Sequence, residues 1–229
     1  MTIKTAAERQ REITRSVALL YLLRERVGTT SINGFSEKYD ALASPENRTQ
    51  GQGKNGWQAI FNGLRPLSES RLKSLSAVPV WSDSSRLYQH GPANLWRAMW
   101  GPVDELRLVV ADELTEWKSF DQMLAEFEGD LLLAEIDRAP LTLACLAKAV
   151  ALYRLHRDVL GLDGVGACRC VRLCLGNDQV QTEMDGLGVL KMVNAELKAS
   201  ILSESNLESA QASADSRWDA IAPRLAWVT

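Results

Sequence analysis

Histidine and cysteine are scarce in this chain, and long apolar runs are missing from it. The two histidines, His90 and His156, stand alone, and neither lies in a recognisable hydrolase pattern. The longest unbroken apolar runs, such as Val17 to Leu20 and Leu131 to Ala134, fall far short of the about 20 residues that a membrane-spanning helix needs. The charged N-terminal residues lack the apolar stretch of a secretory signal. We therefore expect a cytoplasmic protein with no membrane partner.

The cysteines do not have the spacing of a structural metal site. They are Cys145, Cys168, Cys170 and Cys174, and His156 is the histidine that could join them. Structural zinc sites usually consist of two close pairs, such as C-x2-C, separated by a loop. Three of the cysteines lie among Val, Leu and Ala, so burial as small apolar side chains explains them better than zinc does. We expect no metal and no cofactor, and in a cytosolic chain the thiols stay reduced.

The residues from Gly51 to Gly56 match the letters G-x-G-x-x-G but not the context of a nucleotide site. A dinucleotide site needs a buried strand before this turn and an acidic residue about twenty positions later. The polar sequence SPENRTQ precedes it here, and no Asp or Glu falls near positions 70 to 80. A phosphate loop would continue with Lys and Ser or Thr, whereas Trp57 and Gln58 follow. No acid/base dyad stands out elsewhere, so we expect the chain not to be an enzyme.

Charge is distributed unevenly along the 229 residues although its total is small. The net charge is −3, which argues against an indiscriminate polyanion binder. Residues 1–77 contain 12 Lys and Arg against 7 Asp and Glu, a net charge of +5, whereas the remainder contains 14 against 22, a net charge of −8. This asymmetry fits a basic contact module joined to an acidic body. Solvated helix faces also produce local imbalances of this size.

Apolar residues at helical spacing predict a mostly helical chain. Thr5 and Glu8 match a capping box, and the apolar positions that follow recur every three or four residues until Gly28. The segment from Ala167 to Leu175 is ambiguous between helix and strand. The other helices are expected over residues 35–43, 57–62, 68–77, 94–100, 102–129, 140–160, 181–203 and 207–221.

The predicted fold is therefore all-α, with three parts. Residues 1–77 form a basic helical module, and residues 78–102 form a connector rich in aromatic residues, Gly and Pro. Residues 103–229 form an acidic α-helical bundle that serves for dimerisation or for binding a protein partner.

The stretch from Thr49 to Leu75 carries the strongest functional signal. Glycines and amides precede a short helix whose buried stripe consists of Trp57, Ile60 and either Phe61 or Leu64. A Gly-x-Arg-Pro-Leu-Ser turn follows this helix, and a second short helix with basic residues begins after Ser68. Backbone amides and cations arranged in this way suit contact with a nucleic-acid backbone.

The sequence Ala-Ile-Phe-Asn-Gly-x-Arg-Pro-Leu-Ser, between these two short helices, resembles part of the phage-repressor-type (Cro-like) helix-turn-helix regulators. The resemblance covers about residues 32–77 and matches the end of the recognition helix and the turn that follows it. The family joins its two motif helices by a turn of a few residues, whereas Ser44 to Gly56 intervene here. Either this loop is an insertion that itself touches DNA, or the segment is an ordinary helical hairpin with a solvated basic face.

The resemblance implies two kinds of DNA contact. Amides donate and accept hydrogen bonds together, which suits base edges in the major groove, whereas cations suit the phosphate backbone of double-stranded DNA. The implied base or sugar contacts are Asn55, Gln58 and Asn62, and the implied phosphate contacts are Arg48, Lys54, Arg65, Arg71 and Lys73. The favoured function is that of a DNA-binding transcriptional regulator, expected to act as a homodimer. The alternative is a non-enzymatic adaptor or inhibitor that binds another protein through a helical surface.

Overall fold

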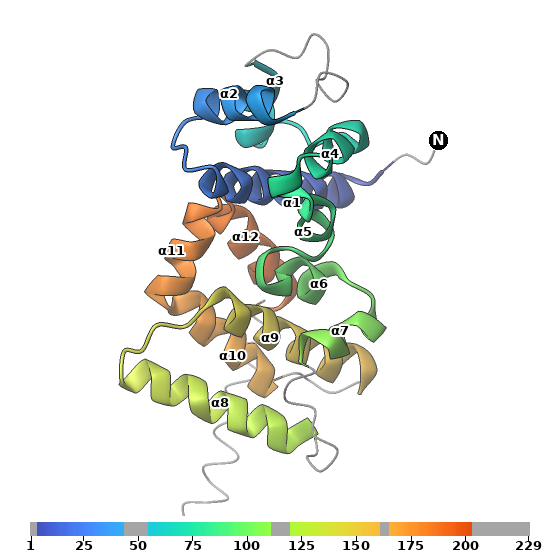
Figure 1. Ribbon diagram of the computed structural model, residues 1–229. Helices are drawn as coiled ribbons and strands as arrows, with labels where there is room; N and C mark the ends of the chain where they lie inside the picture. Colours follow the sequence, from blue (N-terminus) through green and yellow to red (C-terminus); the bar gives the residue numbers. More distant parts are fainter. Residues whose placement is uncertain (1–3, 44–54, 111–119, 161–164, 203–229) are drawn as a thin grey trace, which may run out of the picture. The chain divides into compact units, whose positions relative to one another are not determined.

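The computed structural model describes residues 4–43, 55–110, 120–160 and 165–202, and within these ranges the chain is helical and contains no strand (Figure 1). The predicted all-α class is confirmed. In the same ranges, no helix combines the length and the apolar character needed to cross a membrane. The chain divides into two compact units, Met1–Trp96 with Thr182–Val193, and Arg97–Gln181 with Asn194–Thr229.

Each unit has its own set of helices. The first unit contains α1 (Ala6–Arg26), α2 (Ile32–Leu42), α3 (Asn55–Phe61), α4 (Glu69–Ser76) and α5 (Ser84–His90). The second contains α7 (Val103–Val109), α8 (Phe120–Ile136), α9 (Leu143–Arg154), the π-helical turn Leu155–Val159 and α10 (Val165–Gly176). Residues of α6 (Leu95–Trp100), α11 (Asp178–Gly186) and α12 (Leu190–Ser200) belong to both units.

Local signals at Thr5, Gly28 and Ser68 predicted ends of α1 and α4 correctly, whereas α2 and α3 begin three and two residues before the expected positions 35 and 57. The backbone N–H of Glu8 donates to Thr5 Oγ1 at 3.2 Å, and the N–H of Thr5 donates to Glu8 Oε2 at 2.7 Å, which closes the expected capping box. After α1, Gly28 adopts a φ of +65°, a left-handed conformation that glycine takes without steric cost. Ser68 caps α4 by accepting from the N–H of Arg71.

Several predicted boundaries in the second half of the chain are wrong. The helix expected over residues 102–129 is interrupted, because α7 ends at Val109 and α8 continues through Gly129 to Ile136. Leu131 is buried one turn beyond Phe127, so the apolar stripe of α8 continues past the glycine. The helix expected over residues 181–203 breaks at Gly188, whose φ is +68°. The ambiguous segment from Ala167 to Leu175 is helical, and residues 207–221 lie outside the described part.

An aromatic cluster forms the core of the first unit and joins its early helices. Phe35 of α2 lies 5.3 Å from Trp57 and 5.4 Å from Phe61, both edge-on, and it stacks on Trp81 at 5.3 Å between ring centroids. Tyr39 packs against Trp57 at 5.1 Å. Offset and edge-to-face aromatic pairs add stabilisation beyond the area that they bury. This cluster fixes the orientation of α3, because both of the aromatic side chains of α3 belong to it.

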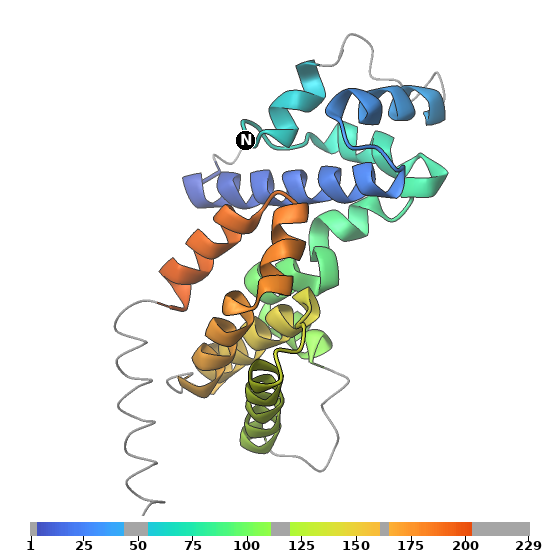
Figure 2. The ribbon, with the colours of Figure 1, turned by 90° about the vertical axis from the view of Figure 1, so that its left-hand side faces the viewer.

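Helix α1 is covered on more than one side in its middle. It lies between α3 and α5 in both ribbon views (Figures 1 and 2), and the residues from 16 to 20 are all buried. Ser16 is fully buried among them, and its hydroxyl donates to Glu12 O at 2.6 Å and accepts from the N–H of Leu67 at 2.8 Å. Leu67 lies in the connection from α3 to α4, so this bond attaches that connection to α1.

A late segment of the chain, residues 182–193, completes the first unit by packing on α1. A β-carbon at Gly188 would lie 2.9 Å from the ring of Tyr21, so only a glycine fits this close approach. Four residues after Gly188, the sulfur of Met192 lies 3.5 Å from the hydroxyl of Thr14 on α1. The first unit is therefore assembled from two separate stretches of sequence.

The second unit is built around α9 and α10. Helix α10 packs against α8 and α9, and α7 packs against α9. Arg154 at the end of α9 donates to the carbonyl oxygens of Ala98 at 3.1 Å and Gly101 at 2.8 Å, which attaches the start of this unit to α9. Asn177 follows α10 and bonds to the backbone before α9.

Three of the four cysteines lie in the core of the second unit. Cys168, Cys170 and Cys174 are buried on α10, and Cys145 is partly exposed. Burial, with a smaller contribution from Glu128, raises the pKa of Cys170 to about 12, and burial also raises the pKa values of Cys168 and Cys174. These three thiols stay protonated at neutral pH and pack as small apolar side chains, as predicted.

The buried bond of Ser16 predicts a specific loss of stability. Replacement of Ser16 by Ala leaves the N–H of Leu67 buried without a partner, and we expect the free energy of unfolding to fall by about 1–3 kcal/mol. Chemical denaturation followed by far-ultraviolet circular dichroism measures this change. Ser74→Ala is the matched control, because Ser74 makes the same bond to the carbonyl four residues earlier but is only partly buried. An equal loss in both variants would contradict the assigned role of Ser16.

Candidate nucleic-acid interface

Helix α3 and the residue that follows it present two amide side chains on the side opposite the aromatic core. Trp57, Ile60 and Phe61 are buried, which confirms the expected stripe with Phe61 as its third member, since Leu64 is 69% exposed. Gln58 and Asn62 are exposed. They are four residues apart, so they lie on one side of the helix, one turn from each other.

A glycine turn ends α3 and brings a guanidinium back to the start of the helix. Gly63 has a φ of +68°, and the N–H of Leu64 donates to Ala59 O at 2.9 Å, which completes a left-handed C-terminal cap. Arg65 follows this turn and is exposed, and its Nη2 donates to the carbonyl oxygen of Gly56 at 2.9 Å. The Gly-x-Arg sequence therefore places a cation beside the N-terminal end of α3.

A second guanidinium reaches the same carbonyl oxygen. Arg71 of α4 donates from Nη1 to Gly56 O at 3.0 Å, so two arginines converge on one acceptor. Burial, and then repulsion from Arg65, lower the pKa of Arg71. No carboxylate of the described residues forms an ion pair with either arginine. Two neighbouring cations without a counter-charge make the start of α3 electropositive.

Arg71 does not lie on the exposed surface that a phosphate contact requires, which corrects its expected role. Its side chain is only 3% exposed, and its guanidinium lies 4.9 Å from the centre of the Trp57 ring. Both Nε and Nη2 are buried without a hydrogen-bond partner. Arg71 therefore stabilises α3 from its buried side, through a cation–π contact with Trp57 and a hydrogen bond to the carbonyl oxygen of Gly56. Arg65 is the exposed member of the pair.

The other predicted contacts have different environments. Lys73 of α4 is exposed and forms an ion pair with Glu69 at 2.8 Å, and both side chains are so exposed that solvent weakens the pair. Asn55 is the first residue of α3. Arg48 and Lys54 lie outside the described residues. Of the predicted contacts, Gln58, Asn62 and Arg65 are thus the ones that are exposed on or directly beside α3.

Sequence reasoning missed one cation close to α3. Arg24 of α1 lies with its guanidinium 4.4 Å from the ring centre of Tyr21 and 5.9 Å from that of Phe61. The spacing of Tyr21 and Arg24, three residues apart on a helix, is a local signal for this stacking. Its approach to Phe61 depends on the tertiary packing of α1 against α3, which no local pattern contains.

The described residues contain no group of three or more His, Cys, Asp or Glu side chains placed to hold a metal ion. What α3 and its surroundings offer is a set of hydrogen-bond donors and acceptors next to positive charge, which suits noncovalent binding of an anion. No protein-family model, no curated protein and no solved structure matches the chain. The function must therefore be inferred from this geometry.

The two arginines are expected to respond differently to truncation. Arg71→Ala removes a buried stem, a contact with Trp57 and a carbonyl bond, so we expect the free energy of unfolding to fall by about 1–3 kcal/mol. Arg65→Ala removes an exposed side chain and should change the free energy of unfolding by less than about 0.5 kcal/mol. Urea denaturation of both variants measures the difference. An equal fall in the free energy of unfolding for both variants would contradict a structural role for Arg71 that Arg65 does not share.

Proposed function

We propose that the chain is a sequence-specific DNA-binding protein, with a role in regulating transcription, that contacts double-stranded DNA through α3. The observation that supports this most directly is the pair of exposed amides, Gln58 on α3 and Asn62 directly after it, which point away from the aromatic core. Arg65 adds an exposed cation at the start of the same helix. This combination joins base-reading groups to a phosphate-binding group.

The dimensions of α3 are compatible with the major groove. Its seven residues span roughly 10 Å at 1.5 Å per residue, and the major groove is about 12 Å wide. Gln58 and Asn62 are separated by roughly 6 Å along the helix axis, close to two base-pair steps of about 3.4 Å. The two amides therefore suit base pairs that are two steps apart, where each amide can donate and accept hydrogen bonds at one base edge.

The charge of the chain favours specific over indiscriminate binding. With a total of −3, the chain as a whole does not attract polyanions strongly, and the positive charge is local to the first unit. We therefore assign affinity to a few phosphate contacts that include Arg65, and discrimination between sequences to the amides.

This function predicts separate effects of the cation and of the amides. A duplex would first be selected from a random pool with the full chain, and then compared with a scrambled duplex by fluorescence anisotropy over a range of salt. Arg65→Ala should weaken binding to both duplexes and reduce the slope of log affinity against log salt by about 1. Gln58→Ala with Asn62→Ala should abolish most of the preference for the selected duplex and leave the salt slope nearly unchanged.

Arg86→Ala is the matched control for these variants. Arg86 is an exposed arginine of α5, and α1 lies between α5 and α3 (Figures 1 and 2). Its removal should leave both affinities unchanged. A chain that enriches no duplex and binds none at low salt would contradict the proposed function and favour the protein-binding alternative.

We further propose that two copies of the chain associate through α8 when they bind DNA. A helix of seven residues makes few contacts, and paired half-sites multiply them. Helix α8 exposes neighbouring apolar side chains, among which Leu133 is 60% and Ile136 is 76% exposed. Such a patch on a surface helix is typical of a contact with another protein.

Self-association should depend on this face of α8. Sedimentation velocity at several concentrations, with the selected duplex present, is expected to show a dimer for the natural chain and a monomer for Leu133→Ser combined with Ile136→Lys. Circular dichroism should be the same for both, because the two side chains are exposed. A natural chain that remains monomeric with its selected duplex would overturn the dimer and assign the patch to a different protein partner.

A further inference from the structure

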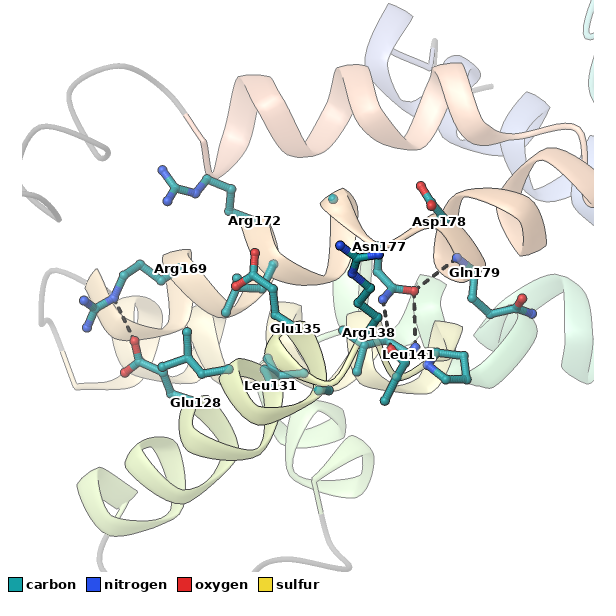
Figure 3. A pocket seen from close by; sticks show the side chains of 16 residues that line it. Glu128, Leu131, Glu135, Arg138, Leu141, Arg169, Arg172, Asn177, Asp178 and Gln179 are labelled. Atoms are coloured by element: carbon teal, nitrogen blue, oxygen red, sulfur yellow. Dashed lines mark hydrogen bonds and ion pairs between the residues drawn. The ribbon is translucent and has the colours of Figure 1, made fainter.

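A cavity of about 890 Å³ lies within the second unit, at the C-terminal end of α8. It is open to solvent on one side and is lined by α8, by the connection to α9, by α10 and by the first residues of α11 (Figure 3). Cavities that bind small molecules in proteins have volumes of about 300–1,000 Å³. The size is therefore suitable for one small organic ligand.

One wall of the cavity is held in place by Asn177. Its Oδ1 accepts from the N–H of Leu141 at 3.2 Å and from the N–H of Gln179 at 3.1 Å, and its Nδ2 donates to Ala139 O at 3.3 Å. These bonds join the connection before α9 to the start of α11, as the dashed lines in Figure 3 show for Leu141 and Gln179. The wall is thus fixed by the fold before any ligand binds.

Of the three arginines that line the cavity, one is held in an ion pair with another lining residue. Arg169 forms an ion pair with Glu128 at 2.7 Å. Arg138 and Arg172 are exposed, and neither forms an ion pair with any of the described residues. Figure 3 shows Arg138 between Glu135 and Asn177 in the central part of the cavity, whereas Arg172 extends from α10 at its edge. The central guanidinium is therefore available to an anion.

Arg138 occupies a backbone position that normally favours glycine. Its φ is +52°, in the left-handed region, and the N–H of Ala139 donates to Ala134 O at 2.8 Å across it. This is the end of α8, where a left-handed residue closes the helix and a side chain costs backbone energy. The backbone cost of an arginine at such a position is consistent with a role for its guanidinium beyond folding.

We propose that this cavity binds a small organic carboxylate with an apolar body. The carboxylate pairs with Arg138, whose planar guanidinium can donate two parallel hydrogen bonds to it, and Arg172 adds positive potential from the edge. Leu131, Leu141 and Leu173 line the cavity and contact the apolar body. The inference concerns the second unit alone and does not depend on DNA binding.

The negative charges of the cavity select a singly charged ligand. Glu135 and Asp178 also line it, so a phosphate monoester with nearly two negative charges would be repelled more strongly than a carboxylate. An organic cation would meet the uncompensated guanidinium of Arg138. A ligand with one carboxylate and an uncharged remainder avoids both costs.

Ligand-observed saturation-transfer NMR with the full chain tests this proposal. The probes are aliphatic and aryl carboxylates of six to twelve carbons, each paired with its primary amide, which has nearly the same shape and no charge. We expect at least one carboxylate to bind tenfold or more tightly than its amide. Competition titration then gives the dissociation constant for the variants.

Arg138→Gly is the decisive variant, because glycine suits the left-handed backbone and the fold should keep or raise its melting temperature. It should remove the preference for the carboxylate over the amide. Arg172→Gln should weaken carboxylate binding by a smaller factor, and Arg107→Ala, an exposed arginine of α7 outside the cavity, should not change it. Failure of every carboxylate to bind, equal binding of the amides, or unchanged binding to Arg138→Gly would each overturn the proposal.

Discussion

The hydrogen bond between the hydroxyl of Ser16 and the N–H of Leu67 is the interaction on which the first unit depends most. It satisfies a donor that is buried with no other partner, and an unsatisfied buried N–H is costly. It also joins α1 to the connection that carries Arg65. The position of the cation relative to α3 is therefore determined from the middle of α1, a long way from it in the sequence. A contact surface held in this way is fixed by the core beneath it.

The two arginines at Gly56 show how one chemical group serves different purposes according to burial. Arg65 is exposed and its guanidinium remains accessible to an anion, whereas Arg71 is covered and contacts Trp57. Both add positive charge to the start of α3. The buried arginine contributes to the electrostatic potential although it cannot touch a ligand, and the potential of a site is therefore a poor guide to which residues form its contacts.

The sequence predicted those features that depend on near neighbours. The capping box at Thr5, the buried stripe of α3 and the glycine that ends α3 all follow from spacings of a few residues. The features that were not predicted depend on contacts between residues that are far apart in the sequence. Arg71 of α4 packs against Trp57 of α3, a contact between two helices that no local pattern contains. Gly188 lies so close to the ring of Tyr21 that a β-carbon there would be 2.9 Å from it. Continuation of α8 through Gly129 could not be predicted from a residue that usually weakens helices, because packing of Leu131 outweighs that preference.

The first unit has a consequence for how the protein is made, because its two stretches are separated by more than eighty residues. The ribosome synthesises α1 to α5 long before residues 182–193. Until then, Tyr21 and Thr14 lack their contacts with Gly188 and Met192. The N-terminal helices therefore cannot reach their final packing until most of the second unit has emerged. A unit of this kind becomes complete only after residues 182–193 have been made, and fragments that end before them lack part of its core.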